Sequence, residues 1–148
     1  MSYLKGFWFF GYSGTGKTYA SRFIKKRKKN SIIIDGDEIR KNISFDLNYS
    51  KKDRDLQILR IYGLAKIIIK SKYFPIISSV WMNKKILKKA KSLHIKVIRV
   101  LNCNYNKKFK KKRTKKNIVG IDIFYDKFRV PKIVNEKNYK FKKLLCKI

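Results

Sequence analysis

The chain has 148 residues, of which 40 are Lys or Arg and 9 are Asp or Glu, so its formal net charge is +31 at pH 7. This length favours one domain over residues 1–148, and the short apolar runs exclude a membrane span and a secretion signal, so we expect a cytoplasmic protein without membrane contact. Lys, Ile and Asn are enriched together, as in proteins from AT-rich genomes, and the aromatic residues lie mostly in apolar runs typical of a core, so we expect no specific nucleic-acid partner despite the charge.

The first predicted elements surround a phosphate-binding loop. The apolar run at 6–10 predicts a strand, and residues 17 to about 28 predict a helix. Between them the pattern G-x-x-x-x-G-K-[ST] is filled by Gly11, Tyr12, Ser13, Gly14, Thr15, Gly16, Lys17 and Thr18. In such a loop the backbone N–H groups surround the phosphates at a helix N-terminus, Lys reaches the β and γ oxygens, and the Ser or Thr hydroxyl ligates Mg²⁺. The motif therefore predicts binding of a nucleoside triphosphate.

A second site motif follows the next strand. The β-branched run at 31–34 predicts a buried parallel strand, and it leads into Asp35-Gly36-Asp37-Glu38-Ile39-Arg40. Ligands of open α/β sheets bind beyond the carboxyl ends of the strands. We therefore expect Lys17, Asp35 and Asp37 to be catalytic, with one carboxylate orienting the attacking hydroxyl. Thr18 and, through a water, Asp35 are the predicted Mg²⁺ ligands. A simpler role for the two aspartates is to cap the short helix expected near 37.

The remaining elements continue the alternation of helix and strand. We expect helices over 52–71, over 83–92 and from about 139, and strands over 74–80, 95–101 and 132–134. The long helix is expected to bury a stripe formed by Leu56, Leu59, Tyr62, Gly63, Ala65 and Lys66. Residues 102–117 are mostly Lys, Asn, Arg and Thr and predict a basic, lid-like loop. The alternation predicts an α/β fold with a parallel sheet. The two cysteines form no C-x-x-C pair and are expected to be reduced thiols.

Taken together, these motifs resemble the adenylylsulfate (APS) kinase family. Its phosphate loop, its Asp-Gly-Asp-x-x-Arg motif and its Asp-Leu-Gly-Phe-Ser segment followed by Asp-Arg correspond to 11–18, 35–40 and 46–54, and its Gly-Ile-Asp motif lies at 117–126. The resemblance covers nearly the whole chain. It implies a five-stranded P-loop kinase fold, often dimeric, and transfer of the γ-phosphoryl of Mg-ATP to the ribose 3′-hydroxyl of adenosine 5′-phosphosulfate in sulfate activation.

The same resemblance assigns residues to the acceptor, a small-molecule nucleotide. Asp37 would hold the 3′-hydroxyl, and Arg40 and Arg54 would bind the 5′ anionic group, for which a planar guanidinium is well suited. Tyr49 would stack on the base in place of the family's phenylalanine.

Other positions depart from the family pattern. Gln57 stands for an asparagine that contacts the acceptor, and Ile118 replaces a second stacking phenylalanine. Met82 occupies the place of a serine described as a phosphorylated intermediate, and it cannot carry phosphate. Ser78 and Ser79, as strand residues, are expected to pack or form hydrogen bonds. We therefore expect direct in-line transfer without a phosphoenzyme.

Two alternatives remain open from the sequence. The altered stacking positions and the short 102–117 segment would suit another nucleotide-linked acceptor, such as cytidine diphosphoramidate in polysaccharide modification. A basic nucleotide- or RNA-binding protein without enzymatic activity is the alternative from a different class. The joint retention of Lys17, Thr18, Asp35 and Asp37 argues against that alternative.

Overall fold

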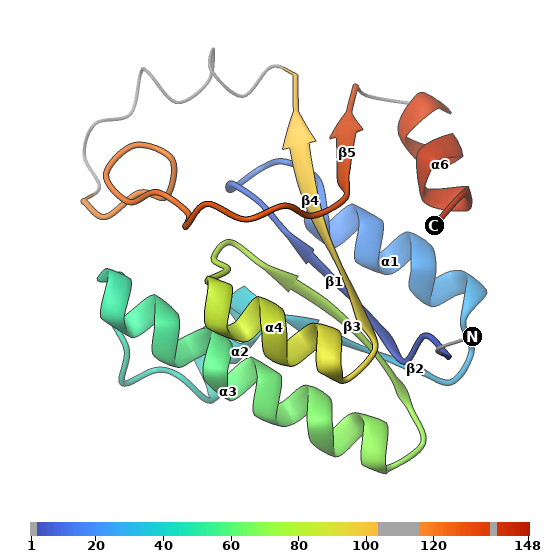
Figure 1. The fold of residues 1–148 in the computed structure, drawn as a ribbon, viewed down its shortest axis with the longest axis horizontal. Coiled ribbons are helices and arrows are strands. Elements are labelled where there is room, and N and C mark those ends of the chain that lie inside the picture. The colour runs from blue at the N-terminus through green and yellow to red at the C-terminus, as the bar shows by residue number, and fades with distance from the viewer. Residues whose placement is uncertain (1–2, 104–115, 137–138) are drawn as a thin grey trace.

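The fold is built around a five-stranded parallel sheet (Figure 1). The computed structural model describes residues 3–103, 116–136 and 139–148. Its strands are β1 (Gly6–Phe10), β2 (Ser31–Asp35), β3 (Phe74–Ser79), β4 (Ile95–Asn102) and β5 (Lys132–Asn135). They lie in the order β2-β3-β1-β4-β5, and each neighbouring pair is parallel. The predicted α/β fold with five parallel strands is confirmed.

Helices cover both faces of this sheet. They are α1 (Lys17–Arg27), α2 (Gly36–Asn42), α3 (Lys51–Lys70), α4 (Lys84–Ser92) and α6 (Tyr139–Cys146). Helices α1 and α6 pack on one face, and α3 and α4 pack on the other (Figure 1). In the part of the chain that the structure describes, no helix is both long and apolar enough to cross a bilayer. Most of the predicted lid-like loop, residues 104–115, lies outside the described residues.

The central strand β1 contributes to both layers of the core. Trp8 and Phe10 pack toward α3 and α4, whereas Phe7 and Phe9 pack toward α1 and α6. All five residues of the strand are buried, as expected for a parallel strand covered on both faces. The loop that follows β1 therefore starts from a rigid, fully packed position in the middle of the sheet.

The apolar stripe predicted for α3 is wrong at Leu56 and Leu59 and right at Ala65. Leu56 and Leu59 are 40% and 42% exposed, whereas the predicted Ala65 is buried together with Ile58 and Ile61. The buried residues keep the three- and four-residue spacing of one helix face. The first turns of that face carry the polar residues Arg54 and Gln57, which line a cavity, so the apolar pattern there is stronger on the neighbouring, exposed face.

Candidate active site

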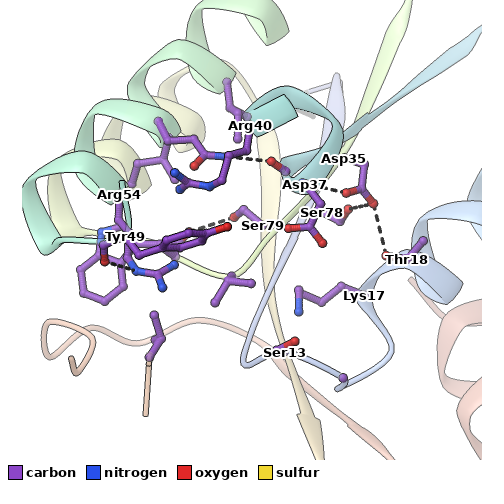
Figure 2. Close-up of a pocket in the computed structure, with 18 of the residues that line it drawn as sticks. Ser13, Lys17, Thr18, Asp35, Asp37, Arg40, Tyr49, Arg54, Ser78 and Ser79 are labelled. Carbon is purple, nitrogen blue, oxygen red and sulfur yellow. Dashed lines mark hydrogen bonds between the residues drawn. The ribbon is translucent and has the colours of Figure 1, made fainter. Parts of the chain in front are cut away.

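An open cavity of about 870 Å³ lies at the carboxyl ends of β1, β2 and β3, and this volume is within the usual range for small-molecule sites. Figure 2 shows the main side chains around it. The predicted site residues that line it are Ser13, Gly14, Gly16, Lys17, Thr18, Asp35, Asp37, Arg40, Tyr49, Arg54, Gln57 and Ile118. The fold thus brings together the phosphate loop and the predicted acceptor residues, which are far apart in the sequence.

The other predicted ATP-binding residues, Gly11, Tyr12 and Thr15, shape the phosphate loop without lining the cavity. The carbonyl of Tyr12 accepts hydrogen bonds from Thr15 Oγ1 at 2.9 Å and from Lys17 Nζ at 2.7 Å. The ring of Tyr12 stacks on Tyr125 with centroids 5.5 Å apart. α1 then begins after Gly16, whose φ of 102° is a left-handed conformation that glycine adopts without a steric penalty.

Lys17 is held in the cavity as a buried cation. Within the described ranges its side chain forms no ion pair with a carboxylate, and the residue is only 8% exposed. Burial lowers the pKa of Lys17 from 10.5 to about 8, and the charges of Asp37 and Asp35 partly oppose this shift. An anionic ligand next to Lys17 would raise its pKa again and restore the ammonium form. A triphosphate would then have a positive charge beside its phosphate oxygens.

We predict that triphosphate binding is linked to proton uptake by Lys17. Near pH 8 part of the free protein carries a neutral amine, and phosphate oxygens raise the pKa of Lys17 again. The affinity for ATP should therefore fall as the pH rises from about 8 to about 10. Calorimetry at about pH 8.5 in two buffers with different ionisation enthalpies should detect uptake of a fraction of a proton.

The variant Lys17→Met provides the control for this linkage, because it has no titrating amine. If the same proton uptake persisted in that variant, the assignment to Lys17 would be wrong. The free energy of unfolding gives a second check with a defined sign. The unfolded chain binds more protons than the folded chain between pH 8 and pH 10.5. The free energy of unfolding of the ligand-free protein should therefore rise by about 3 kcal/mol as the pH rises through this window.

Asp35 organises the end of β2. Its Oδ1 accepts a hydrogen bond from the backbone N–H of Asp37 at 2.9 Å, which caps α2. Its Oδ2 accepts hydrogen bonds from Thr18 Oγ1 at 3.2 Å and from Ser78 Oγ at 3.0 Å (Figure 2). Asp35 therefore both caps α2 and lines the cavity. Hydroxyl and carboxylate oxygens are ligands that Mg²⁺ prefers, so these residues fit the predicted metal.

The carboxylate of Asp37 is free for a ligand. Among the described residues its side chain has no hydrogen-bond or ion-pair partner, whereas Asp35 is fixed by two hydroxyl groups. Asp37 lines the cavity, on the same side as Lys17 in Figure 2. One carboxylate is thus held in place and its neighbour is available to accept a proton or a hydrogen bond.

Two arginines approach the other end of the cavity and are oriented by backbone carbonyls. Arg40 Nη1 donates to Asn48 O at 2.7 Å. Arg54 donates from Nε to Tyr49 O at 3.1 Å and from Nη2 to Asn117 O at 2.9 Å. Neither arginine forms an ion pair with a carboxylate among the described residues. The remaining N–H groups of the two guanidinium groups are left for an anion.

The two guanidinium groups lie close enough to repel each other when no anion is bound at this end of the cavity. Burial lowers the pKa of both arginines, and the charge of Arg40 lowers the pKa of Arg54 further. Both groups lie over the ring of Tyr49, at 4.6 Å and 5.5 Å from its centroid (Figure 2). This contact was not predicted. A base that stacks on Tyr49 would have to share the ring with them.

Gln57 is buried on α3 and lines the same cavity. Its Nε2 donates to Gly36 O at 2.7 Å, while its Oε1 is buried and has no hydrogen-bond partner in the part of the chain that the structure describes. Such an orphaned acceptor is costly unless a ligand supplies a donor. Ile118 lines the cavity from the loop after residue 116. Trp81 and Asn117 also line the cavity, although neither was a predicted site residue: Asn117 opens the 117–126 motif, of which only Ile118 was assigned to the acceptor.

The comparison with known families decides which family this is. The model of the family described as adenylylsulphate kinase matches residues 5–135 of the chain. The chain belongs to the adenylylsulfate kinase family. The resemblance inferred from the motifs is therefore confirmed.

Relatives of this adenylylsulfate kinase family member align over part of the chain. A probable bifunctional SAT/APS kinase 2 from Sorangium cellulosum is 44% identical over 68 residues, which are 43% of this chain and 12% of that protein. A probable adenylyl-sulfate kinase from Synechocystis is 31% identical over 77 residues, which are 49% of this chain and 44% of that protein. The chain thus spans less than half the length of these relatives.

A solved structure confirms the fold over almost the full length. The APS kinase from Mycobacterium tuberculosis, in complex with AMPPNP and APS, superposes with a TM-score of 0.81 at 17% identity and covers 97% of this chain and 94% of that chain. At such low identity the likeness concerns the fold alone.

Met82 is one of the positions at which this adenylylsulfate kinase family member departs from the family pattern. Met82 is fully buried in the core, so the position offers no group that could accept phosphate. The expectation that Ser78 and Ser79 form hydrogen bonds is confirmed, because Ser78 donates to Asp35, and Ser79 donates to Trp81 O at 2.8 Å. The side chain of Ser78 nevertheless lines the cavity, a position that its place in a strand did not indicate.

Proposed function

We propose that this protein transfers the γ-phosphoryl group of ATP to the ribose 3′-hydroxyl of adenosine 5′-phosphosulfate. The observation that carries the proposal is the free carboxylate of Asp37, which lies in one cavity with the buried ammonium of Lys17 and the carbonyl-oriented pair Arg40 and Arg54. Membership of the adenylylsulfate kinase family supports it. The arrangement provides a place for a triphosphate, a carboxylate for a hydroxyl, and cations for the anionic end of an acceptor.

In this reaction the phosphate loop binds the triphosphate through its backbone N–H groups. Lys17 leaves the carbonyl of Tyr12 and binds the β and γ oxygens, where charge develops during transfer. Asp37 orients the acceptor hydroxyl and takes its proton. The bond between the hydroxyl oxygen and the γ-phosphorus forms while the bond from that phosphorus to the β–γ bridging oxygen breaks, and ADP leaves.

The metal is assigned to the residues around Asp35. Thr18 and, through a water, Asp35 would hold Mg²⁺, with Ser78 keeping the carboxylate in position. When bound, the ion neutralises charge on the β and γ oxygens of the triphosphate.

The acceptor would lie between the arginines and Asp37. Arg40 and Arg54 would bind its 5′ anionic group, and Tyr49 would contact its base. The unpartnered Oε1 of Gln57 would accept a hydrogen bond from a hydroxyl or amino group of the acceptor.

A different nucleotide-linked acceptor is the second candidate. Ile118 lines the cavity where an aromatic residue is expected, and the ring of Tyr49 is shared with two guanidinium groups. Adenine therefore lacks an aromatic sandwich here. Cytidine diphosphoramidate carries an anionic diphosphate-like group and a smaller base, and it would meet the same arginines.

Acceptor-dependent release of ADP from Mg-ATP distinguishes these candidates. The assay compares adenosine 5′-phosphosulfate, cytidine diphosphoramidate and a blank without acceptor. Stimulation by adenosine 5′-phosphosulfate supports the proposed reaction. Stimulation by cytidine diphosphoramidate alone would show that this compound is the acceptor instead. No stimulation by any acceptor, despite ATP binding, would contradict the kinase proposal and favour a non-enzymatic nucleotide-binding protein.

A further inference from the structure

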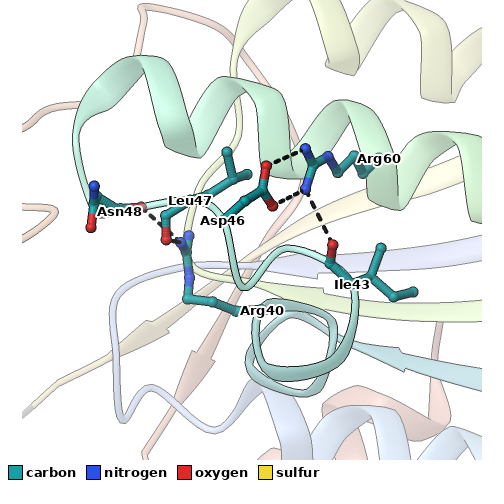
Figure 3. A network of polar contacts seen from close by, with 6 residues as sticks. All are labelled: Arg40, Ile43, Asp46, Leu47, Asn48 and Arg60. Atoms are coloured by element: carbon teal, nitrogen blue, oxygen red, sulfur yellow. Dashed lines mark hydrogen bonds and ion pairs between the residues drawn. The ribbon is translucent and has the colours of Figure 1, made fainter.

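The loop between α2 and α3, residues 43–50, is held in place by an arginine outside the cavity. Arg60 on α3 donates two hydrogen bonds to the carboxylate of Asp46, from Nη1 to Oδ1 at 2.5 Å and from Nη2 to Oδ2 at 2.7 Å. The same Nη1 donates to Ile43 O at 3.2 Å (Figure 3). One side chain of α3 therefore fixes two points of a segment that has no helix or strand of its own.

The opposite side of this 43–50 loop is bound to the cavity. Arg40 on α2 donates from Nη1 to Leu47 O at 3.2 Å and to Asn48 O at 2.7 Å (Figure 3). The loop also carries Tyr49, whose ring contacts the Arg40 guanidinium. The position of the loop thus determines which N–H groups of Arg40 remain directed to the cavity. Arg60 does not line the cavity, so it can influence a ligand only through the loop.

An exposed ion pair is usually a weak contact, but this pair differs from others in the described chain. Its geometry is bidentate, and it joins a helix to a loop 14 residues earlier in the sequence. The pairs of Lys41 with Glu38 and of Lys140 with Glu136 are single contacts at 3.6 Å and 3.4 Å between residues three or four apart. The pair of Lys51 with Asp126 joins distant segments, but it is a single contact at 3.9 Å.

We propose that Arg60 is a positioning residue for the acceptor: through Asp46 it fixes the 43–50 loop and thereby the orientation of Arg40 and Tyr49 in the cavity. This inference rests on the proposed function in one respect, namely that the acceptor is an anionic nucleotide bound by Arg40. The part that concerns the loop rests on the contacts alone.

Steady-state kinetics of Arg60→Gln and Asp46→Asn test the effect on the acceptor. Each variant should raise the KM for the acceptor about fivefold to tenfold, with kcat and the KM for ATP changed less than about twofold, because the arginine acts on the position of a binding group. Arg60→Lys, which can keep one contact to Asp46, should restore part of the affinity. The double variant should be no worse than either single variant, since the two residues act as a unit.

Lys41→Gln is the matched control. It removes one positive charge and an ion pair with Glu38 on the surface of α2, and it should leave every kinetic constant unchanged. Effects of Arg60→Gln and Asp46→Asn that add independently, or an equal rise in the KM for ATP, would overturn the proposal. A lower melting temperature with an unchanged acceptor KM would also overturn it, because the pair would then be structural only.

Amide hydrogen exchange separates this proposal from the proposed function. In Arg60→Gln, exchange should become faster in residues 43–50 and stay unchanged in the phosphate loop, whether or not any acceptor is turned over. If no acceptor is phosphorylated but this local change occurs, the kinase proposal fails, and the part of the inference in which Arg60 fixes the 43–50 loop stands. Unchanged exchange in residues 43–50 would overturn the positioning role even in an active kinase.

Discussion

Replacing Lys17 with alanine is expected to lower acceptor-dependent ADP release about 1000-fold or more, because it removes the one buried ammonium that faces the transferred group in the described cavity. The loss should appear mainly in kcat, since the charge on the γ-phosphoryl oxygens and the bridging oxygen changes most in the transition state. The remaining backbone N–H groups of the loop should keep some affinity for ATP. Single-turnover measurement of phosphoryl transfer checks the prediction directly.

Lys26→Ala is the matched control for Lys17→Ala. Lys26 lies on the same helix, α1, but is exposed to solvent, so its removal changes the net charge equally without touching the cavity. Both variants should fold, and Lys17→Ala should be at least as stable as the parent at pH 7, because burial of the ammonium is unfavourable. Loss of activity in both variants would mean that overall charge, and not the position of Lys17, controls turnover.

The phosphate loop and the Asp35–Asp37 motif were predictable from sequence because each is local. A strand, a glycine turn and a helix N-terminus follow one another within 6–27, and the second motif directly follows a buried strand. Their meeting at one edge follows from the parallel sheet, in which the carboxyl ends of neighbouring strands lie together. The prediction that Lys17 and Asp37 lie close together is confirmed by the cavity that both residues line.

The contacts that shape the acceptor end were not predictable in the same way. The pair of Arg60 and Asp46 depends on the path of a loop, and the packing of Tyr49 against two guanidinium groups depends on carbonyls that orient Arg40 and Arg54. No periodic pattern encodes such contacts, because each joins side chains to backbone atoms of another segment. The stripe on α3 was predicted wrongly at Leu56 and Leu59 for a related reason, since the buried face of its first turns carries polar residues that line the cavity.

The distribution of charge links these observations. The chain has only 9 Asp and Glu residues against 40 Lys and Arg, and three of these acids, in the cavity or in the loop next to it, have distinct roles. Asp35 is fixed by hydroxyl groups, and Asp46 holds a loop. Of these three, only Asp37 has a side chain without a hydrogen-bond or ion-pair partner among the described residues. An unpaired carboxylate near a buried ammonium is the group from which a specific chemical role is expected.

Asp37→Asn is therefore expected to reduce kcat by about 100-fold to 10,000-fold, the range typical of a lost general base. The asparagine keeps the size and a hydrogen-bonding oxygen, so the KM for ATP and the melting temperature should change little. The charge of Asp37 also raises the pKa of Lys17, so this pKa should fall further below 8 in the variant, and proton uptake on ATP binding should be detectable at a lower pH.

Glu38→Gln is the appropriate comparison for Asp37→Asn, because Glu38 is the next residue of α2 and pairs with Lys41 on the surface. It should retain full turnover. Asp35→Asn should behave differently again: it should raise the Mg²⁺ concentration needed for half-maximal activity, as expected for a residue that holds the metal. If Asp37→Asn kept the turnover of the parent, Asp37 would not be needed to take the proton of the hydroxyl. The free carboxylate of Asp37 would then no longer support the proposed function, even if Lys17→Ala were inactive.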